Sequence, residues 1–241
     1  MLNQIFNEDC LEWMKRIPDG SIDCVITDPP YWTTACKWDS IIPFEPMWAE
    51  LKRIVKSNGA IVLFGNEPFS SLLRTSNLKI YRYDWKWDKV RGSNFATVNI
   101  RPFNSFEDIC IFYTKQPTYN PQMEKWKPYT QKQWFVGEAK QTWLKRKQVI
   151  TENKWERYPL SIIRISKENW LHPTQKPVAL IEYLIKTYTN EWETVLDFTM
   201  GSGTTAIACI NTNRNYIGFE LDKWYFDIAN ERIAWKLQNK E

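Results

Sequence analysis

Residues 194–220, TVLDFTMGSGTTAIACINTNRNYIGFE, decide the fold. They begin with an apolar run over 194–198 that is typical of a buried strand, and Gly201-Ser202-Gly203 then predicts a tight turn. The small residues after this turn predict a helix packed closely on the strand, and residues 215–219 predict a second strand that ends at Glu220. This order is that of an α/β unit with a ligand site at the carboxyl edge of its strands.

The chemistry of the same stretch favours a nucleoside as the ligand. Glycines let the backbone approach a ligand closely, and the free N–H groups at the start of a helix attract negative charge. A carboxylate at the end of the next strand, here Glu220, is the usual group that binds two ribose hydroxyls. No lysine follows the glycines, so a phosphate-binding loop is disfavoured. The alternative is a tight turn beside a solvated glutamate, and this stretch alone leaves that alternative open.

The rest of the chain extends the pattern in both directions. Apolar runs predict further strands, and helical spacing of apolar residues predicts further helices. The strands are expected over 21–27, 60–64, 81–87 and 108–113, and the helices over 46–56, 177–188 and 222–237. This alternation predicts an α/β fold with a Rossmann-like, doubly wound, mainly parallel sheet. The periodicity weakens over 115–170, so we expect an insertion there, between a first part (1–114) and a last part (171–241).

Composition argues against several classes of protein. The 241 residues include one histidine, His172, and five cysteines without a CxxC pair, which disfavours a metal site, a zinc ribbon and a disulfide framework. No apolar run reaches the roughly 18 residues of a membrane helix. Glu8 and Asp9 come before any apolar stretch, unlike in a signal peptide. We therefore expect a cytoplasmic protein that needs neither a membrane nor a metal.

A second motif, Asp28-Pro29-Pro30-Tyr31, follows the strand predicted over 21–27. The exocyclic amine of a base is a poor nucleophile, because its lone pair is delocalised into the ring. Acceptors on both N–H bonds release that lone pair, and the Asp28 carboxylate and the Pro29 carbonyl can supply them from a turn that the prolines stiffen. Tyr31 can stack on a base taken out of the helix. The alternative is an ordinary turn at the end of a strand.

Together the two motifs resemble the amino-methyltransferases of DNA that use S-adenosylmethionine. The order, with DPPY first, a variable region next and the glycine-rich motif last, resembles the β group of these enzymes. The stretch His172-Pro173-Thr174-Gln175-Lys176-Pro177 is similar to the family's HPTxKP motif, and Asp9-Cys10 resembles its contact to the cofactor's adenine. The resemblance covers nearly the whole chain apart from the variable segment, and it implies a seven-stranded sheet.

The resemblance also implies roles for individual residues. It assigns catalysis to Asp28, Pro29, Pro30 and Tyr31. It assigns S-adenosylmethionine binding to Asp9, Cys10, His172, Thr174, Lys176, Asp197, Phe198, Gly201, Ser202, Gly203, Thr204, Thr205 and Glu220. The family usually reads D-P-F-x-G-S-G, whereas here Phe198 directly follows Asp197, so the aromatic residue has moved by one position. His172 could instead be a structural core residue, and Lys176 a solvated surface charge.

The net charge of +4 is unevenly distributed. Residues 115–157 carry ten basic and four acidic side chains, which gives +6 there and leaves −2 for the rest. Tryptophans are interleaved with these charges, a pattern that favours a nucleic-acid surface, and the resembling family carries its target-recognition region here. A solvated subdomain with its tryptophans packed inside is the alternative. The residues expected to contact DNA are Lys37 and Trp38 near the target base and Lys125, Lys127, Lys132, Lys145, Arg146 and Lys147 in the insertion.

We therefore expect a site-specific DNA methyltransferase that moves a methyl group from S-adenosylmethionine to N6 of a flipped adenine in double-stranded DNA. N4-cytosine methylation is the nearest alternative; serine more often takes the first motif position in similar cytosine enzymes, so Asp28 favours adenine. Methylation of RNA or of a protein glutamine, and a DNA-binding module without catalysis, are further alternatives. The sequence leaves open the recognition sequence, a homodimer and a cognate restriction endonuclease.

Overall fold

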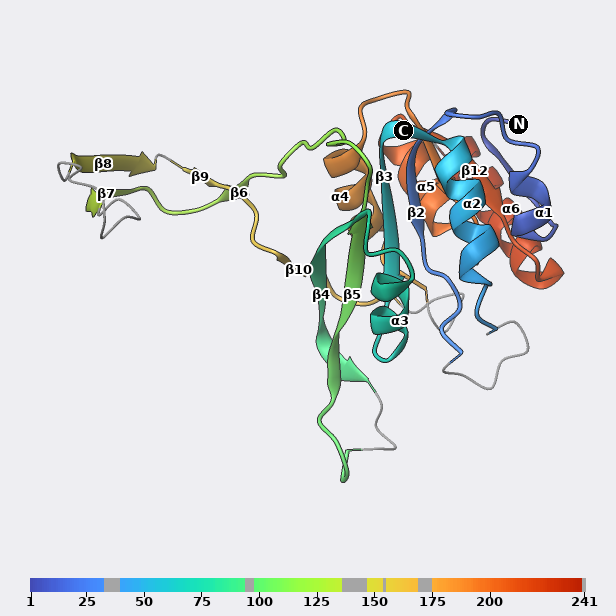
Figure 1. Ribbon diagram of the computed structural model, residues 1–241, viewed down its shortest axis with the longest axis horizontal. Coiled ribbons are helices and arrows are strands. Elements are labelled where there is room, and N and C mark those ends of the chain that lie inside the picture. Colours follow the sequence, from blue (N-terminus) through green and yellow to red (C-terminus); the bar gives the residue numbers. More distant parts are fainter. Residues whose placement is uncertain (33–39, 94–97, 136–146, 154, 169–174, 240–241) are drawn as a thin grey trace. The chain divides into compact units, whose positions relative to one another are not determined.

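The computed structural model describes residues 1–241 except 33–39, 94–97, 136–146, 154, 169–174 and 240–241 (Figure 1). The chain divides into two compact units. The main unit combines Met1–Asn120 with Ser161–Glu241, and the small unit is Pro121–Leu160. Among the described residues, no helix is both long and apolar enough to cross a membrane.

One sheet forms the centre of the main unit, with the strand order β1-β12-β11-β2-β3-β5-β4-β10. Among its described strands, β5 runs antiparallel to both of its neighbours, β3 and β4, and the other five pairs are parallel. The strands are β1 (Gln4–Phe6), β2 (Ile22–Thr27), β3 (Val55–Gly65), β4 (Tyr81–Ser93), β5 (Asn104–Phe112), β10 (Ile162–Arg164), β11 (Thr194–Asp197) and β12 (Asn215–Phe219).

The prediction of seven strands was wrong, because the described sheet has eight. Two of these strands, β1 and β10, match none of the predicted strand ranges, and β10 comes from the range where we expected only an insertion. β10 pairs in parallel with β4 through Ile162, Ile163 and Arg164. Ile163 is buried, whereas its two neighbours are exposed, so a single apolar side chain anchors this edge strand.

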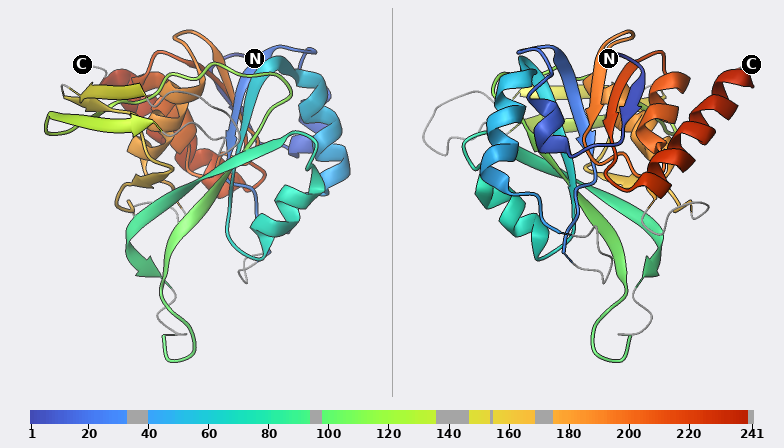
Figure 2. Two further views of the ribbon diagram at one scale, coloured as in Figure 1. Left: turned by 60° about the vertical axis from the view of Figure 1, so that its left-hand side comes forward. Right: turned by 90° about the vertical axis from the view of Figure 1, so that its right-hand side faces the viewer.

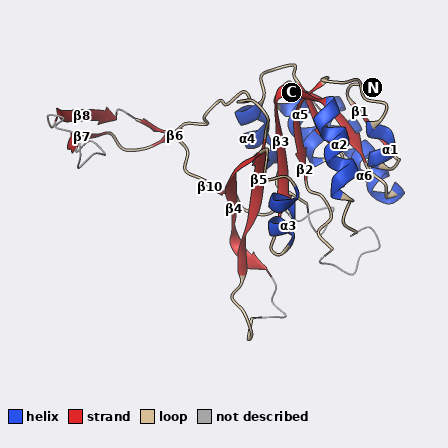
Figure 3. Ribbon diagram, viewed as in Figure 1, coloured by secondary structure: helices blue, strands red, loops and turns tan. Residues whose placement is uncertain are grey.

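Helices cover both faces of the sheet (Figures 2 and 3). On one face α4, α5 and α6 bury side chains such as Leu184 and Ala208. On the other face α1, α2 and α3 bury side chains such as Leu51 and Leu73. Strands between two such layers need apolar residues on both sides, which explains the continuous buried run at the end of β3. The helices are α1 (Cys10–Met14), α2 (Phe44–Ile54), α3 (Phe69–Ser76), α4 (Val178–Tyr188), α5 (Thr204–Asn211) and α6 (Lys223–Gln238).

The small unit consists of two antiparallel strand pairs. β6 (Glu124–Lys125) pairs with β9 (Glu156–Arg157), and β7 (Tyr129–Phe135) pairs with β8 (Lys147–Asn153). A two-stranded ribbon exposes most of its side chains, because no further strand or helix packs on it.

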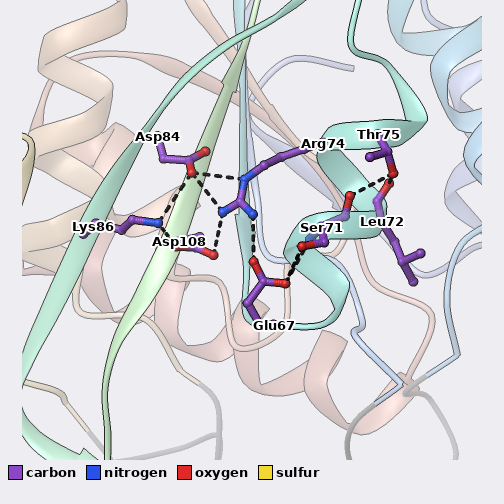
Figure 4. Close-up of polar contacts among 8 residues, drawn as sticks. All are labelled: Glu67, Ser71, Leu72, Arg74, Thr75, Asp84, Lys86 and Asp108. Carbon is purple, nitrogen blue, oxygen red and sulfur yellow. Dashed lines mark hydrogen bonds and ion pairs between the residues drawn. The ribbon is translucent and has the colours of Figure 1, made fainter.

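A charged network fixes α3 to β4 and β5 in the main unit (Figure 4). The Arg74 guanidinium lies 2.8 Å from a Glu67 oxygen, 2.9 Å from Asp84 Oδ2 and 2.7 Å from Asp108 Oδ2. The Asp108 side chain is only 3% exposed, and Lys86 also binds it. Arg74 therefore compensates carboxylates that burial would otherwise destabilise.

We expect Arg74→Met to lower the free energy of unfolding by about 3 kcal/mol, because it leaves Asp84 and Asp108 with Lys86 as their remaining cation. Urea denaturation of the purified protein measures this. The matched control is Lys15→Met, which removes an exposed pair with Glu12 and should cost less than about 0.5 kcal/mol. Equal losses in the two variants would show that the Arg74 network contributes no more than a surface ion pair.

Candidate active site

The site lies at the carboxyl edge of three parallel strands. β2 ends at Thr27, β11 at Asp197 and β12 at Phe219, and β11 lies between the other two. The residues that follow these strands therefore converge on one edge of the sheet. A cavity of about 250 Å³ opens there. Its lining includes Asp9, Asp28, Lys176, Gly201 and Glu220.

The Asp28 carboxylate is held by two donors. Its Oδ1 accepts a hydrogen bond from the Tyr31 hydroxyl, and its Oδ2 accepts one from Lys176 Nζ. The Tyr31 ring is stacked on Phe69 with ring centroids 5.0 Å apart. Burial raises the pKa of Asp28 above its ordinary value, although the Lys176 ammonium acts in the opposite direction. The orientation of the carboxylate is thus fixed from two sides.

Lys176 lines the cavity, and its ammonium points to carboxylates. Besides Asp28, Nζ lies 3.2 Å from Glu107 Oε2, and the Lys176 side chain is 8% exposed. Sequence analysis did not single out Glu107, which lies on β5 just before the strand predicted over 108–113. No spacing rule connects residues 28, 107 and 176, so the tertiary fold alone reveals this cluster.

The Glu220 carboxylate accepts backbone hydrogen bonds from the glycine-rich turn and from the residue before α6. Its Oε2 accepts the Gly201 N–H at 2.7 Å, and its Oε1 accepts the Asp222 N–H at 2.9 Å. Burial raises the pKa of Glu220. Gly203 has φ +82°, and a Cβ there would lie 3.0 Å from the Ala229 Cβ, so only glycine fits between the turn and α6.

The buried carboxylate of Asp197 connects the strand before the Asp28 motif with the glycine-rich stretch through hydrogen bonds. It accepts hydrogen bonds from the hydroxyls of Thr27 and Thr205, both at 2.5 Å, and from the Thr199 N–H at 3.1 Å. The Thr199 hydroxyl in turn donates to the Asp28 carbonyl at 3.0 Å. Burial raises the pKa of Asp197 to about 6. Thr27 and Thr199, which sequence reasoning missed, connect the turn after β2 to the turn after β11.

Most of the other predicted cofactor residues that the structure describes line the same cavity. Asp9 caps α1, because its Oδ1 accepts the N–H groups of Leu11 and Glu12 at 2.8 and 3.2 Å. Burial raises the pKa of Cys10 to about 12, so its thiol is not a ready nucleophile. Ser202 donates to Gln175 at 3.2 Å, a residue that sequence reasoning quoted without a role. The cavity lining also includes Cys10, Phe198, Ser202, Thr204 and Thr205.

Six of the predicted residues lie outside the described part of the chain. They are Lys37, Trp38, Lys145, Arg146, His172 and Thr174. Lys147 belongs to β8, and only its backbone is described.

The small unit presents basic and aromatic side chains. Lys125, Lys127 and Lys132 are exposed. The Arg157 guanidinium lies 4.6 Å from the ring centroids of both Trp126 and Tyr129. Trp126 and Trp155, the two tryptophans of this unit whose side chains are described, are 47% and 66% exposed, so these two do not pack inside.

In the described ranges, no group of three or more His, Cys, Asp or Glu side chains is placed to hold a metal ion.

The chain is similar in sequence and in structure to known DNA methyltransferases. The family model N6_N4_Mtase, described as DNA methylase, matches residues 22–231. Type II methyltransferase M.HpaI of Haemophilus parainfluenzae is 28% identical over 97% of this chain and 74% of its own length. Type II methyltransferase M1.MboII of Moraxella bovis is 26% identical over 95% of each chain. The crystal structure of the M1.HpyAVI-SAM complex superposes with a TM-score of 0.64 at 26% identity, covering 95% of this chain and 98% of that one.

Proposed function

Because the chain belongs to the N6_N4_Mtase family of DNA methylases, we propose that it methylates N6 of a flipped adenine at a specific site in double-stranded DNA. The observation that carries the proposal is the Asp28 carboxylate, fixed by Tyr31 and Lys176 beside the cavity that Glu220 and Gly201 line. The first position of this motif is Asp28, whereas similar cytosine enzymes more often have serine at that position.

S-adenosylmethionine is the cofactor, as in the solved neighbour that is 26% identical. The cavity fits it on chemical grounds. Among the described residues that line it, the acids are Glu8, Asp9, Asp28, Asp197 and Glu220 and the base is Lys176, a balance that suits a sulfonium cation and disfavours phosphates.

The individual contacts also fit. The two Glu220 oxygens each accept one backbone N–H, which leaves a lone pair on each for a ribose hydroxyl. Apolar Phe198 and Leu221 line the same cavity and suit a flat base. Asp9 and Cys10, at the start of α1, belong to the same proposed cofactor set, as do His172 and Thr174.

The residues of this chain prepare the target amine. When bound, S-adenosylmethionine supplies an electrophilic methyl group. Asp28 accepts one N–H of the adenine amine and the Pro29 carbonyl accepts the other, so that the nitrogen lone pair is released from the ring. The remaining lone pair of an Asp28 oxygen is the acceptor for the proton that the amine loses. Tyr31, fixed by its hydroxyl and by Phe69, provides a rigid aromatic surface for the flipped base.

The small unit is proposed to bind the DNA. Lys125, Lys127 and Lys132 supply exposed charge for phosphates, and Trp126 and Trp155 supply exposed aromatic surface. Lys145, Arg146 and Lys147 belong to the same proposed surface, and Lys37 and Trp38 to the base pocket. A cognate restriction endonuclease, a cytoplasmic location and a homodimer complete the proposal for a restriction–modification enzyme.

Nucleoside mass spectrometry tests the proposed function. The purified full chain is incubated with S-adenosylmethionine and DNA from a host without DNA methyltransferases, and the DNA is digested to nucleosides. We expect N6-methyldeoxyadenosine, confined to one sequence context when modified bases are mapped. N4-methyldeoxycytidine instead would overturn the adenine assignment, and the absence of any methylated base would overturn the enzyme assignment.

A further inference from the structure

Four side chains of alternating charge, beginning on β4 and ending at Asp28, form a row of ion pairs. Lys89 Nζ on β4 lies 3.3 Å from Glu107 Oε1 on β5. Glu107 Oε2 lies 3.2 Å from Lys176 Nζ, which binds the Asp28 carboxylate. The four side chains are 1%, 15%, 8% and 22% exposed in that order, so this is a mostly buried cluster of two cations and two anions.

Aromatic rings enclose the ammonium of Lys176. Its Nζ lies 5.1 Å from the ring centroid of Phe64, 5.9 Å from that of Tyr31 and 6.0 Å from that of Trp87. Rings at such distances favour a cation and exclude water. Burial lowers the pKa of Lys176, but the carboxylates of Asp28 and Glu107 outweigh burial and raise it. Lys176 is therefore an ammonium at neutral pH.

Burying four charges is costly, and a packed apolar cluster would serve stability as well. The opposite end of β2 provides the contrast. There Asp23 pairs with Lys56, and the two side chains are 12% and 44% exposed, so the lysine of that pair is open to solvent. The pair at Asp28 differs because its lysine is buried and because its carboxylate is the proposed acceptor of the target amine.

We propose that Lys176 and Glu107 are positioning residues of the methyl transfer, which keep the Asp28 carboxylate ionised and oriented toward the target amine. This inference rests on the proposed function. Lys176 holds Oδ2, Tyr31 holds Oδ1, and each oxygen keeps a lone pair for the N–H of the amine. Glu107 balances Lys176, and Lys89 balances Glu107.

The signs of the charges around Asp28 make the proposal testable. The groups that face it are the ammonium of Lys176, the hydroxyl of Tyr31 and the carboxylates of Glu107 and Asp197. Removing the positive charge of Lys176 disfavours the ionised form of Asp28, whereas removing the negative charge of Glu107 favours it. Activity requires the ionised form, so the acid limb of the pH profile should move in opposite directions in the two variants.

The experiment compares kcat for methyl transfer between pH 5 and 9 at saturating DNA and cofactor. Lys176→Met should lower kcat on the order of 100-fold at neutral pH and move the acid limb to higher pH. Glu107→Gln should move the limb to lower pH, and Lys176→Arg, which keeps the charge, should leave it near its wild-type position. KM for DNA should change less than about threefold in these variants, because neither side chain is proposed to bind DNA.

Two further measurements separate the possible failures. Carbon-13 NMR of carboxyl-labelled aspartate, with Asp28 assigned by Asp28→Asn, follows the titration of Asp28 without any activity. Lys56→Met, the matched lysine–aspartate pair at the other end of β2, should leave both the Asp28 titration and the pH profile unchanged. If the Asp28 titration in Lys176→Met and in Glu107→Gln equals that of the wild type, the inference is overturned while the proposed function stands. A wild-type protein that methylates no DNA overturns the proposed function.

Discussion

Asp28→Ala is expected to abolish methyl transfer, with a loss of at least 10³-fold in kcat, while the protein still binds S-adenosylmethionine. The variant removes the acceptor for the amine proton and leaves the Pro29 carbonyl as the remaining acceptor on the amine. Loss of one preorganised hydrogen-bonding group in an active site costs about 10²–10³-fold, and loss of the proton acceptor adds to this. The Kd for the cofactor should rise less than about fivefold, because the residues proposed to bind its ribose and its base are unchanged.

Tritium transfer from labelled S-adenosylmethionine to DNA measures the rate, and calorimetry measures the cofactor Kd. Asp23→Ala is the matched control, since it removes a carboxylate from the opposite end of the same strand, and it should transfer at close to the wild-type rate. Lys176 keeps Glu107 as a partner in Asp28→Ala, so the variant should fold. An Asp28→Ala protein that transfers within tenfold of the wild type would contradict the assigned role.

Glu220→Ala is expected to raise the Kd for S-adenosylmethionine about 100-fold and to leave DNA binding unchanged. Two hydrogen bonds from ribose hydroxyls to an ionised carboxylate contribute about 3 kcal/mol together, which is that factor. Glu220→Gln keeps one acceptor oxygen, so its Kd should rise about tenfold. Asp222→Asn is the control: it removes one charge from the same turn and keeps the cap of α6, because Asn also accepts N–H groups.

The same residue predicts a pH dependence of cofactor binding. Burial raises the pKa of Glu220, and the ionised form is the proposed acceptor for the ribose hydroxyls. The affinity should therefore be full at pH 8 and decline as the pH falls through this raised pKa, earlier than for an ordinary glutamate. Calorimetry over pH 8 to 5 measures the decline, and Glu220→Gln, which does not titrate, should show a flatter profile. Identical profiles in the two proteins would argue against Glu220 as the ribose ligand.

Local patterns were sufficient for much of the fold. The run predicted as a strand over 194–198 is β11, and the helix expected after Gly203 is α5, because apolar runs and glycine turns act over a few residues. The pairing of β10 with β4 was not predictable, since three residues with one buried side chain carry no periodic signal. The reversed direction of β5 likewise depends on which neighbours it meets in space.

The candidate site divides in the same way. The turns that carry Asp28 and Gly201 were readable because their chemistry is contained in four or five consecutive residues. The neighbours of Lys176 in sequence placed it in a cofactor motif. In the structure its ammonium instead donates a hydrogen bond to Asp28, which is 148 residues away in sequence. Glu107 had no local signal at all, because its significance depends on a lysine that only the folded sheet brings within 3.2 Å.

The strand order has a consequence for synthesis on the ribosome. β1, at the start of the chain, pairs with β12 near its end, and β2 pairs with β11. A growing chain that has not yet reached residue 194 lacks both partners, so β2 presents an unpaired edge and residues 4–6 have no strand beside them. Such long-range closure slows folding and exposes the nascent sheet to association. The proposed cofactor pocket, whose lining includes residues near 9, 28 and 200–220, therefore forms only after β11 and β12 have been synthesised.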